Sequence, residues 1–225
     1  MSFLEKAALV AWKDLRAEFR TKEMLSGMLI FAFLVVVIFG FAFDPSRAAL
    51  REVMPGIVWV GFFFAAELGL ARSFTSERAS DCLLGLMLAP VDRSAIYFGK
   101  VASNWVLVTI MEAVSLPVFL LLYDFRFVGS WWLLAGAVLA ATFGFVAAGT
   151  FLAALAANSR TSEILLPILL FPIVVPVVIA GVEITRAVFA GGGGEMIGTW
   201  FNVLGVYDVV FVTVPFLLFE YVLEV

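Results

Sequence analysis

The chain has 225 residues, of which 64% are hydrophobic and 14% charged, and its mean hydropathy is +1.10. Soluble domains are about 45–50% apolar and about 25% charged, so this composition indicates a single integral membrane domain over residues 1–225. The net charge of −4 leaves no basic surface for phosphates and excludes a nucleic-acid partner. With no histidine and one cysteine, Cys82, the chain alone builds no His-ligated metal or haem site.

The first predicted element is an amphipathic helix over residues 3 to about 20, inside a segment 1–23 that precedes the spans. Helical spacing puts apolar residues on one face: Leu4, Ala8, Ala11, Leu15 and Phe19. It puts cations on another face: Lys6, Lys13, Arg16 and Arg20. The pattern is typical of a helix lying in the interface of a lipid bilayer. A soluble helix packed on a cytoplasmic partner would show the same pattern.

Six stretches are long and apolar enough to span a membrane, which takes about 20 mostly apolar residues. They cover residues 24–43, 53–71, 101–123, 131–157, 164–188 and 200–223. The first is not a cleaved signal peptide, because five more spans follow and no small-x-small site follows Phe43. We therefore expect an all-α membrane protein with six transmembrane helices.

A polar loop over residues 72–100 separates the second and third predicted spans. Within it, Ser76 to Leu88 can form a short helix that Pro90 ends, after which Asp92 or Ser94 can cap the next helix. Its apolar side holds Leu83, Leu86 and Met87. Charged residues around it favour a position in water: Glu77, Arg78, Asp81, Asp92, Arg93 and Lys100. Such a helix is suited to docking on a soluble partner, although a re-entrant or interfacial helix is an alternative.

The fifth predicted span contains Pro167, Pro172 and Pro176. Each proline removes a backbone donor and crowds the preceding turn, so we expect a kinked or interrupted helix there. Proline is also commoner in membrane helices than in soluble ones, so a kink by itself predicts no binding site.

Three acidic residues fall inside predicted spans: Glu67, Glu112 and Asp208. A charge at the bilayer centre costs at least roughly 2.5–3.5 kcal/mol, so such residues usually line a polar path or bond a neighbouring helix. Glu112 lies near the midplane and either role fits it. For Glu67, near the inner end of its span and one turn from Arg72, the packing role is favoured.

Orientation follows from the distribution of Lys and Arg in the short connections. With the N-terminus inside, ten of these residues fall on the inner side and four on the outer side. Trp131, Trp132 and Trp200 then lie where outer-face aromatic anchors are expected. Both termini and the 72–100 loop are therefore predicted to be cytoplasmic.

No motif in the chain predicts catalysis. It contains no GxxxxGK[ST] nucleotide loop, no GxSxG nucleophile motif and no metal-ligand spacing. We expect a protein that is not an enzyme by itself.

Four stretches resemble the CcmB family, the membrane subunit of the ATP-binding-cassette complex of bacterial cytochrome c maturation. They are PGIVWV at 55–60, ARSFTSER at 71–78 running into LLGLMLAPVDRSAIYFGK at 83–100, ILLPILLFPIVVPVVIAG at 164–181, and YDVVF with LFEYVLE near the end. They occur in order over most of the chain. The chain differs from the usual family pattern at Asp81, where glycine is common, and at Leu84, where an acidic residue is common.

This resemblance implies a six-helix permease of the ABC-2 type in the bacterial inner membrane. ATP would bind to a separate cytoplasmic ATPase subunit, and haem would be handled by the complex with haem-binding membrane subunits and a periplasmic haem chaperone. The coupling element that contacts the ATPase would comprise Arg72, Glu77, Arg78, Asp81, Leu83, Leu86, Met87 and Pro90.

Two other functions fit the residues. One is a permease for another amphiphile, such as a lipid or a drug, with Glu112 lining the route. The other is an assembly scaffold that transports nothing. The sequence leaves open whether the chain forms a homodimer.

Overall fold

The fold was analysed on a computed structural model, which describes residues 2–42, 48–79, 92–123, 129–157, 162–192 and 194–222. All elements in these ranges are helices: α1 (Phe3–Thr21), α2 (Glu23–Ala42), α3 (Ala48–Ala79), α5 (Arg93–Leu122), α6 (Trp131–Ala157), α7 (Ser162–Phe189) and α8 (Gly194–Val222). Six of them, all except α1, are long and apolar enough to cross a membrane by length and composition. The predicted all-α membrane fold with six spans is confirmed.

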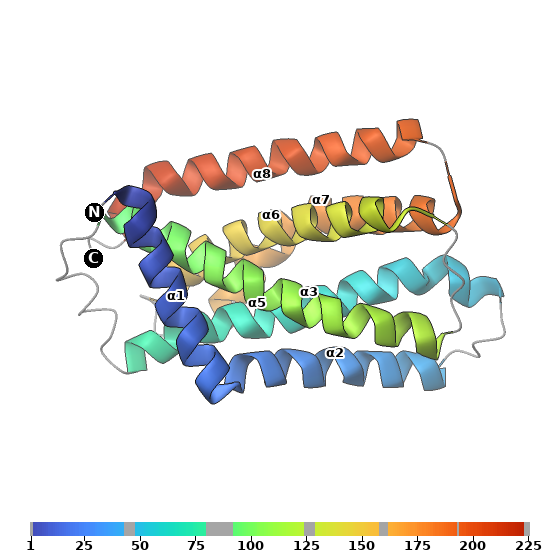
Figure 1. The fold of residues 1–225 in the computed structure, drawn as a ribbon, viewed down its shortest axis with the longest axis horizontal. Helices are drawn as coiled ribbons and strands as arrows, with labels where there is room; N and C mark the ends of the chain where they lie inside the picture. Colours follow the sequence, from blue (N-terminus) through green and yellow to red (C-terminus); the bar gives the residue numbers. More distant parts are fainter. Residues whose placement is uncertain are drawn as a thin grey trace.

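The six long helices run side by side along the longest axis of the molecule (Figure 1). Helix α6 packs against α3, α5, α7 and α8. It is rich in small residues, and its buried ones include Ala137, Ala141, Ala147, Ala148 and Ala153. Lipid tails are as apolar as leucine, so membrane helices associate through close contact, which small side chains allow. Helices α6 and α3 are the two most buried of the six candidate spans.

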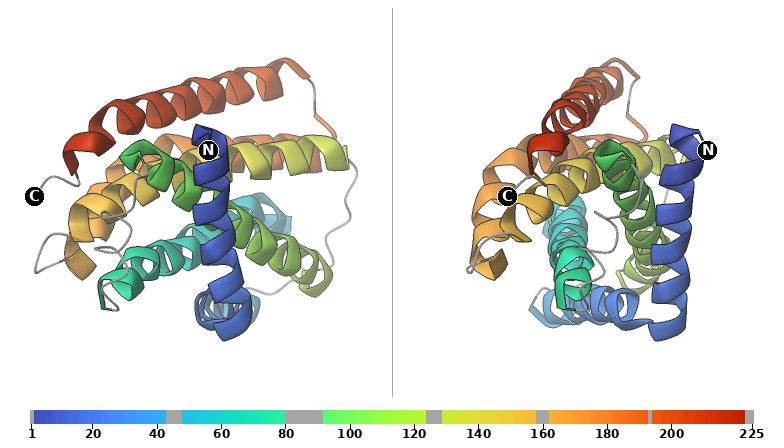
Figure 2. Two further views of the ribbon diagram at one scale, coloured as in Figure 1. Left: turned by 60° about the vertical axis from the view of Figure 1, so that its left-hand side comes forward. Right: turned by 90° about the vertical axis from the view of Figure 1, so that its left-hand side faces the viewer.

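Helix α1 begins with a capping box, in which the Ser2 hydroxyl accepts from the Glu5 amide and the Glu5 carboxylate accepts from the Ser2 amide. Its axis is not aligned with the six long helices. Viewed end-on, α1 runs crosswise to them along one side of the bundle end (Figure 2). The beginning of α1 and the end of α8 lie at that same end (Figure 1). The start of α1 and the end of α8 are thus on one side of the six spans.

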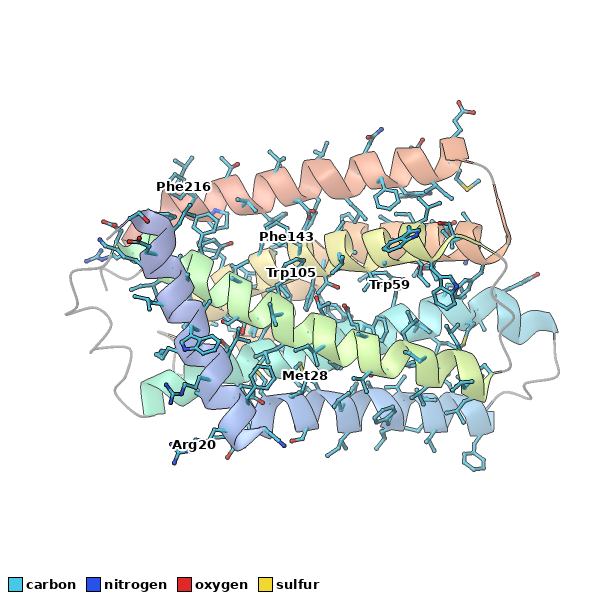
Figure 3. The ribbon with its side chains drawn as sticks, in the orientation of Figure 1. Arg20, Met28, Trp59, Trp105, Phe143 and Phe216 are labelled. Carbon is cyan, nitrogen blue, oxygen red and sulfur yellow. The ribbon has the colours of Figure 1, made fainter. Side chains whose placement is uncertain are left out.

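The apolar face predicted for α1 is not the face that packs on the bundle. Leu4, Trp12 and Phe19 are 77%, 64% and 51% exposed, whereas Val10 is buried. The docked face is a neighbouring one, formed by Phe3, Ala7, Val10 and Asp14, and it packs on α5. The cations lie on a third side, and Arg20 points away from the bundle (Figure 3). This three-sided helix suits an interfacial position, with one side on protein, one toward lipid and one toward headgroups.

A sharp elbow joins α1 to α2 at Lys22. Its φ of 57° is in the left-handed region, and its amide donates to the Glu18 carbonyl to close α1. The Glu18 carboxylate accepts from the Leu25 amide at 2.8 Å, which satisfies a free donor at the start of α2. The elbow therefore ends one helix and begins the next without leaving these groups unpaired.

Helix α7 is continuous from Ser162 to Phe189 and contains Pro167, Pro172 and Pro176 in its interior. The sequence predicted a kinked or interrupted helix, and of these two forms the interrupted one is not found. Membrane helices tolerate proline because neighbouring helices and local adjustments satisfy the freed backbone groups. The helix ends at a glycine turn, where Gly191 has a φ of 66° and the Gly192 amide donates to the Ala187 carbonyl.

The predicted 72–100 loop is helical at both of its described ends. Helix α3 continues to Ala79, so residues 76–79 belong to α3. The sequence had predicted that a separate helix starts at Ser76. Helix α5 begins at Arg93, so residues 93–100 are its first two turns. The remainder of the predicted short helix lies outside the described residues.

Candidate functional site

The first group of predicted contact residues lies at the end of α3. Arg72 is exposed, and its guanidinium lies 3.3 Å from the carboxylate and 3.5 Å from the carbonyl oxygen of Glu23. Glu77 and Arg78 lie in the last turn of α3. The other contact residues, Asp81, Leu83, Leu86, Met87 and Pro90, lie outside the described residues. We call the end of α3, from Arg72, the α3 stem of the predicted coupling segment. The structure places this stem beside the start of α2.

The second stem is the beginning of α5. Asp92 occupies the N-cap position, as predicted, but its side chain makes no capping hydrogen bond. Its Oδ2 atom lies 3.2 Å from Nζ of Lys6 on α1 instead. Helix α1 is therefore tied to the first residue of the second stem.

The sequence suggested that Lys100 lies in water, but the structure buries it. Its side chain is 1% exposed, and its ammonium lies 3.3 Å from Oδ2 of Asp14 on α1 and 3.5 Å from the carbonyl oxygen of Ser73 on α3. The Ser103 hydroxyl also lies 3.4 Å from Oδ2 of Asp14. A buried charge is costly unless it is paired and hydrogen-bonded, and this one is both. Lys100 therefore joins three helices at one end of the bundle.

The close crossing of α1 over α5 depends on Gly99. A Cβ atom at this position would lie 2.6 Å from Cβ of Val10 and 2.7 Å from the carbonyl oxygen of Ala7. Only glycine lets the two backbones approach so closely.

Sequence reasoning missed the pair between Asp14 and Lys100. A signal was available, since Asp14 continues the helical stripe of Phe3, Ala7 and Val10 at spacings of four, three and four residues. An acidic residue in such a stripe predicts a buried cationic partner. Hydrophobic periodicity favours the neighbouring stripe of Leu4, Ala8 and Leu15 instead, because that stripe is more apolar.

Glu112 lies beside a small cavity inside the bundle. The side chain is 3% exposed, and the Thr142 hydroxyl lies 2.8 Å from Oε1 and 2.7 Å from Oε2. The cavity is about 20 Å³, and its walls include Trp59, Phe62, Phe63, Ala66, Phe145 and Val177. That volume suits about one water molecule. Glu112 thus bonds α6 through Thr142, which fits the packing role, and it also lies beside a small, mostly apolar cavity.

We expect Thr142→Val to destabilise the protein more than Glu112→Gln does. Valine keeps the volume of threonine but leaves the buried carboxyl without its donor, at a cost of roughly 0.5–2 kcal/mol. Glutamine retains an acceptor for the Thr142 hydroxyl, so its effect should be smaller. Thermal unfolding of the purified protein in detergent measures both. A larger loss for Glu112→Gln would show that the ionisable group itself matters.

The other two intramembrane carboxyls lie elsewhere. Glu67 is buried on α3, and Arg72, one turn away, pairs with Glu23. Asp208 on α8 lies against Gly144 of α6. Its Oδ1 atom and the hydroxyl of the neighbouring Tyr207 are buried and have no hydrogen-bond partner among the described residues.

These carboxyls do not form one polar path. Only Glu112 lines the cavity. Thr142, its partner, and Gly144, which Asp208 contacts, are two residues apart on α6 and so face opposite sides of that helix. Within the described ranges, no three His, Cys, Asp or Glu side chains gather as a metal site would require. The positions of these three carboxyls favour a role in bonding helices to one another over a catalytic or metal-binding role.

Polar side chains of α5 also bond α6 and α8 directly. The Tyr97 hydroxyl lies 3.0 Å from the Ala147 carbonyl oxygen of α6 and 3.3 Å from the Phe211 carbonyl oxygen of α8. The Trp105 indole donates to the Leu139 carbonyl at 3.1 Å, and its ring packs edge-on against Phe143 (Figure 3). The second stem therefore continues into a helix that is firmly bonded to the centre of the bundle.

Comparison with known proteins gives matches over nearly the whole chain. The family model described as CcmB protein matches residues 5–224. Heme exporter protein B of Paracoccus denitrificans is 31% identical over 186 residues, which cover 83% of this chain and 84% of that protein. Heme exporter protein B of Rhodobacter capsulatus is 29% identical over 77% of this chain and 79% of that protein. The protein of that name from Pseudomonas aeruginosa is 26% identical over 82% of both.

Proposed function

Since this chain belongs to the CcmB family, we propose that it is the permease subunit of an ATP-driven complex that serves haem export for cytochrome c maturation. The observation that carries the proposal is the match over residues 5–224, together with relatives named Heme exporter protein B that align over most of their length. The six candidate spans support a subunit that works inside the membrane.

ATP would bind to another chain, a cytoplasmic ATPase, because this sequence has no nucleotide-binding loop. We assign the contact with that ATPase to the segment from Arg72 to Pro90. Both stems of this segment lie at the same end as α1, and Arg72 is exposed there. The excess of Lys and Arg on this side supports a cytoplasmic location for it and for both termini, in a bacterial inner membrane.

Haem would be bound by other members of the complex, namely haem-handling membrane subunits and a periplasmic haem chaperone. The chain has no histidine for haem iron, and the cavity beside Glu112 is about 20 Å³, which suits one water molecule and not a porphyrin. The role of this subunit would be to transmit the motion of the ATPase to its partners in the membrane.

A second candidate function is a permease for another amphiphile, and one observation favours it. An apolar groove of about 150 Å³ lies between α3 and α7, lined by residues that include Val60, Phe64 and Phe171. Phe63 and Val178 line both this groove and the Glu112 cavity. A side-chain movement there would connect the membrane-facing surface with Glu112.

Covalent-haem staining of c-type cytochromes in a strain that lacks this gene tests the proposal. We expect the stained bands to disappear in the deletion strain and to return with the wild-type gene. The double variant Leu83→Asp, Leu86→Asp should fail to restore them, because two carboxylates would replace the apolar side of the contact segment. Met196→Asp, an exposed position at the opposite end of α8, serves as the matched control and should restore them.

Unchanged bands in the deletion strain would refute a role in cytochrome c maturation and favour the second candidate. Full rescue by the Leu83, Leu86 variant would show that the ATPase contact lies elsewhere. Membrane abundance of each variant, measured on the same samples, separates loss of contact from loss of protein.

A further inference from the structure

Three ion pairs tie α1 and the start of α2 to the two stems of the coupling segment. Glu23 at the start of α2 pairs with Arg72 on the α3 stem at 3.3 Å. Lys6 pairs with Asp92 at the start of the α5 stem at 3.2 Å, and Asp14 pairs with Lys100 two turns further on at 3.3 Å. Helix α1 and the start of α2 thus contact both stems of the segment assigned to the ATPase.

The three pairs differ in burial. In the Glu23 and Arg72 pair both side chains are more than half exposed, and Asp92 is 64% exposed in the Lys6 pair. Exposed pairs contribute little to stability, because water and salt screen them. Lys100 is 1% exposed and Asp14 is 17% exposed, so their pair is shielded from water and salt. Asp14 also pairs with Lys13 at 3.1 Å, but Lys13 is on α1 too, so the pair with Lys100 is the one that ties Asp14 to α5.

Lys100 also connects the stems with each other. Its ammonium lies 3.5 Å from the Ser73 carbonyl oxygen of α3, one residue after Arg72. A displacement of the α3 stem or of the α5 stem therefore acts on the same ammonium group. Through Asp14, the displacement also acts on α1.

We propose that Asp14 and Lys100 are positioning residues, which join α1 and the two stems into one unit that holds the ATPase contact in place. The proposal rests on the proposed function, because it takes the Arg72 to Pro90 segment as that contact. Neither residue needs to touch the ATPase. Their effect on the ATPase is transmitted through the docking of α1 on α5.

The test compares Lys100→Met, Asp14→Asn and the double variant in the full complex purified from membranes. Two quantities are measured on each sample: the amount of ATPase retained, and the rate at which a water-soluble maleimide labels cysteine at Val10. Val10 is 5% exposed and packs on Gly99, so labelling reports whether α1 is docked. Cys82→Ala, introduced throughout, removes the native thiol, and the retention of ATPase in this background is measured first.

We expect Lys100→Met to raise the labelling rate and to lower the retained ATPase, each by about tenfold or more, because Oδ2 of Asp14 loses its cationic partner on α5. Lys13, which lies 3.1 Å from Oδ1 of Asp14, is on α1 itself and does not hold α1 to α5. The double variant removes both charges and should recover much of the protection. Glu183→Gln, which breaks an exposed pair with Arg186 near the other end of the bundle, is the matched control and should change neither quantity.

Unchanged labelling in Lys100→Met would overturn the proposal, and so would increased labelling with full retention of ATPase. If Lys100→Met does not accumulate in the membrane, Asp14→Asn and the double variant carry the same comparison. A wild-type chain that retains no ATPase would instead refute the proposed function, while the labelling still reports on the ion pair.

Discussion

Replacing Gly99 with alanine is expected to destabilise the protein by about 1–3 kcal/mol and to loosen α1 from α5. The added Cβ would lie 2.6 Å from Cβ of Val10 and 2.7 Å from the Ala7 carbonyl oxygen. The second atom belongs to the backbone and cannot rotate away, so the whole of α1 must shift. This shift opposes the gain of up to about 1 kcal/mol that alanine normally brings over glycine inside a helix.

Gly27→Ala is the matched control, since no atom lies within 4 Å of a Cβ built on Gly27 in α2. It should be neutral or slightly stabilising. Thermal unfolding in detergent gives both values. Adding Val10→Ala to Gly99→Ala removes Cγ1 of Val10, which lies 2.8 Å from the added Cβ, but keeps the contacts with Cβ of residue 10 and with the Ala7 carbonyl oxygen, so it should recover only a small part of the loss. Equal stability of the Gly99 and Gly27 variants would show that α1 does not pack on α5 as described.

The second large effect is expected for Gly144→Ala, which should push α8 away from α6. A Cβ atom there would contact Oδ1 of Asp208 and would lie 2.8 Å from Cδ1 of Tyr207. The Tyr207 ring is stacked on Phe211 with centroids 4.3 Å apart, so the ring has little freedom to yield. We expect a loss of about 1–3 kcal/mol, measured by thermal unfolding.

Gly205→Ala on α8 provides the comparison, because a Cβ at this position meets nothing within 4 Å. Combining Gly144→Ala with Asp208→Ala removes the carboxyl oxygen and should recover part of the stability. If Gly144→Ala is as stable as Gly205→Ala, then α8 does not rest on α6 through this glycine.

The six spans were predictable because they depend on composition over about 20 residues. Glu23–Ala42 and Trp131–Ala157, for example, lie within one residue of the predicted spans 24–43 and 131–157. The start of α5 was misplaced, since the polar run from Asp92 to Lys100 suggested water. In the structure Lys100 is paired with Asp14, 86 residues earlier, and a local pattern does not report a partner at such a distance.

The predicted site was recovered unevenly for the same reason. Nearby residues offered Asp92 or Ser94 as the cap of the next helix, and Asp92 occupies the N-cap position, although its side chain makes no capping hydrogen bond. That its side chain pairs with Lys6 depends on how α1 crosses the bundle, which hydrophobic periodicity does not determine. Glu112 was singled out because charge is rare in a span, whereas its bond to Thr142 required the relative rotation of two helices. Of the kinked or interrupted helix expected over residues 164–188, the interrupted form is not found, because neighbouring helices can satisfy the backbone groups that proline frees.

The crossing of α1 over α5 also determines when α1 can dock during synthesis of the chain. Lys6 and Asp92 are 86 positions apart, as are Asp14 and Lys100, so α2 and α3 must be synthesised before α1 meets its partner. During that interval the docking side of α1, with Asp14 in it, has no protein to cover it. The exposed apolar side chains of Leu4, Trp12 and Phe19 can bind the newly synthesised α1 to the membrane surface during this interval. The nascent chain thus carries its own anchor until α5 has been synthesised and can pack against α1.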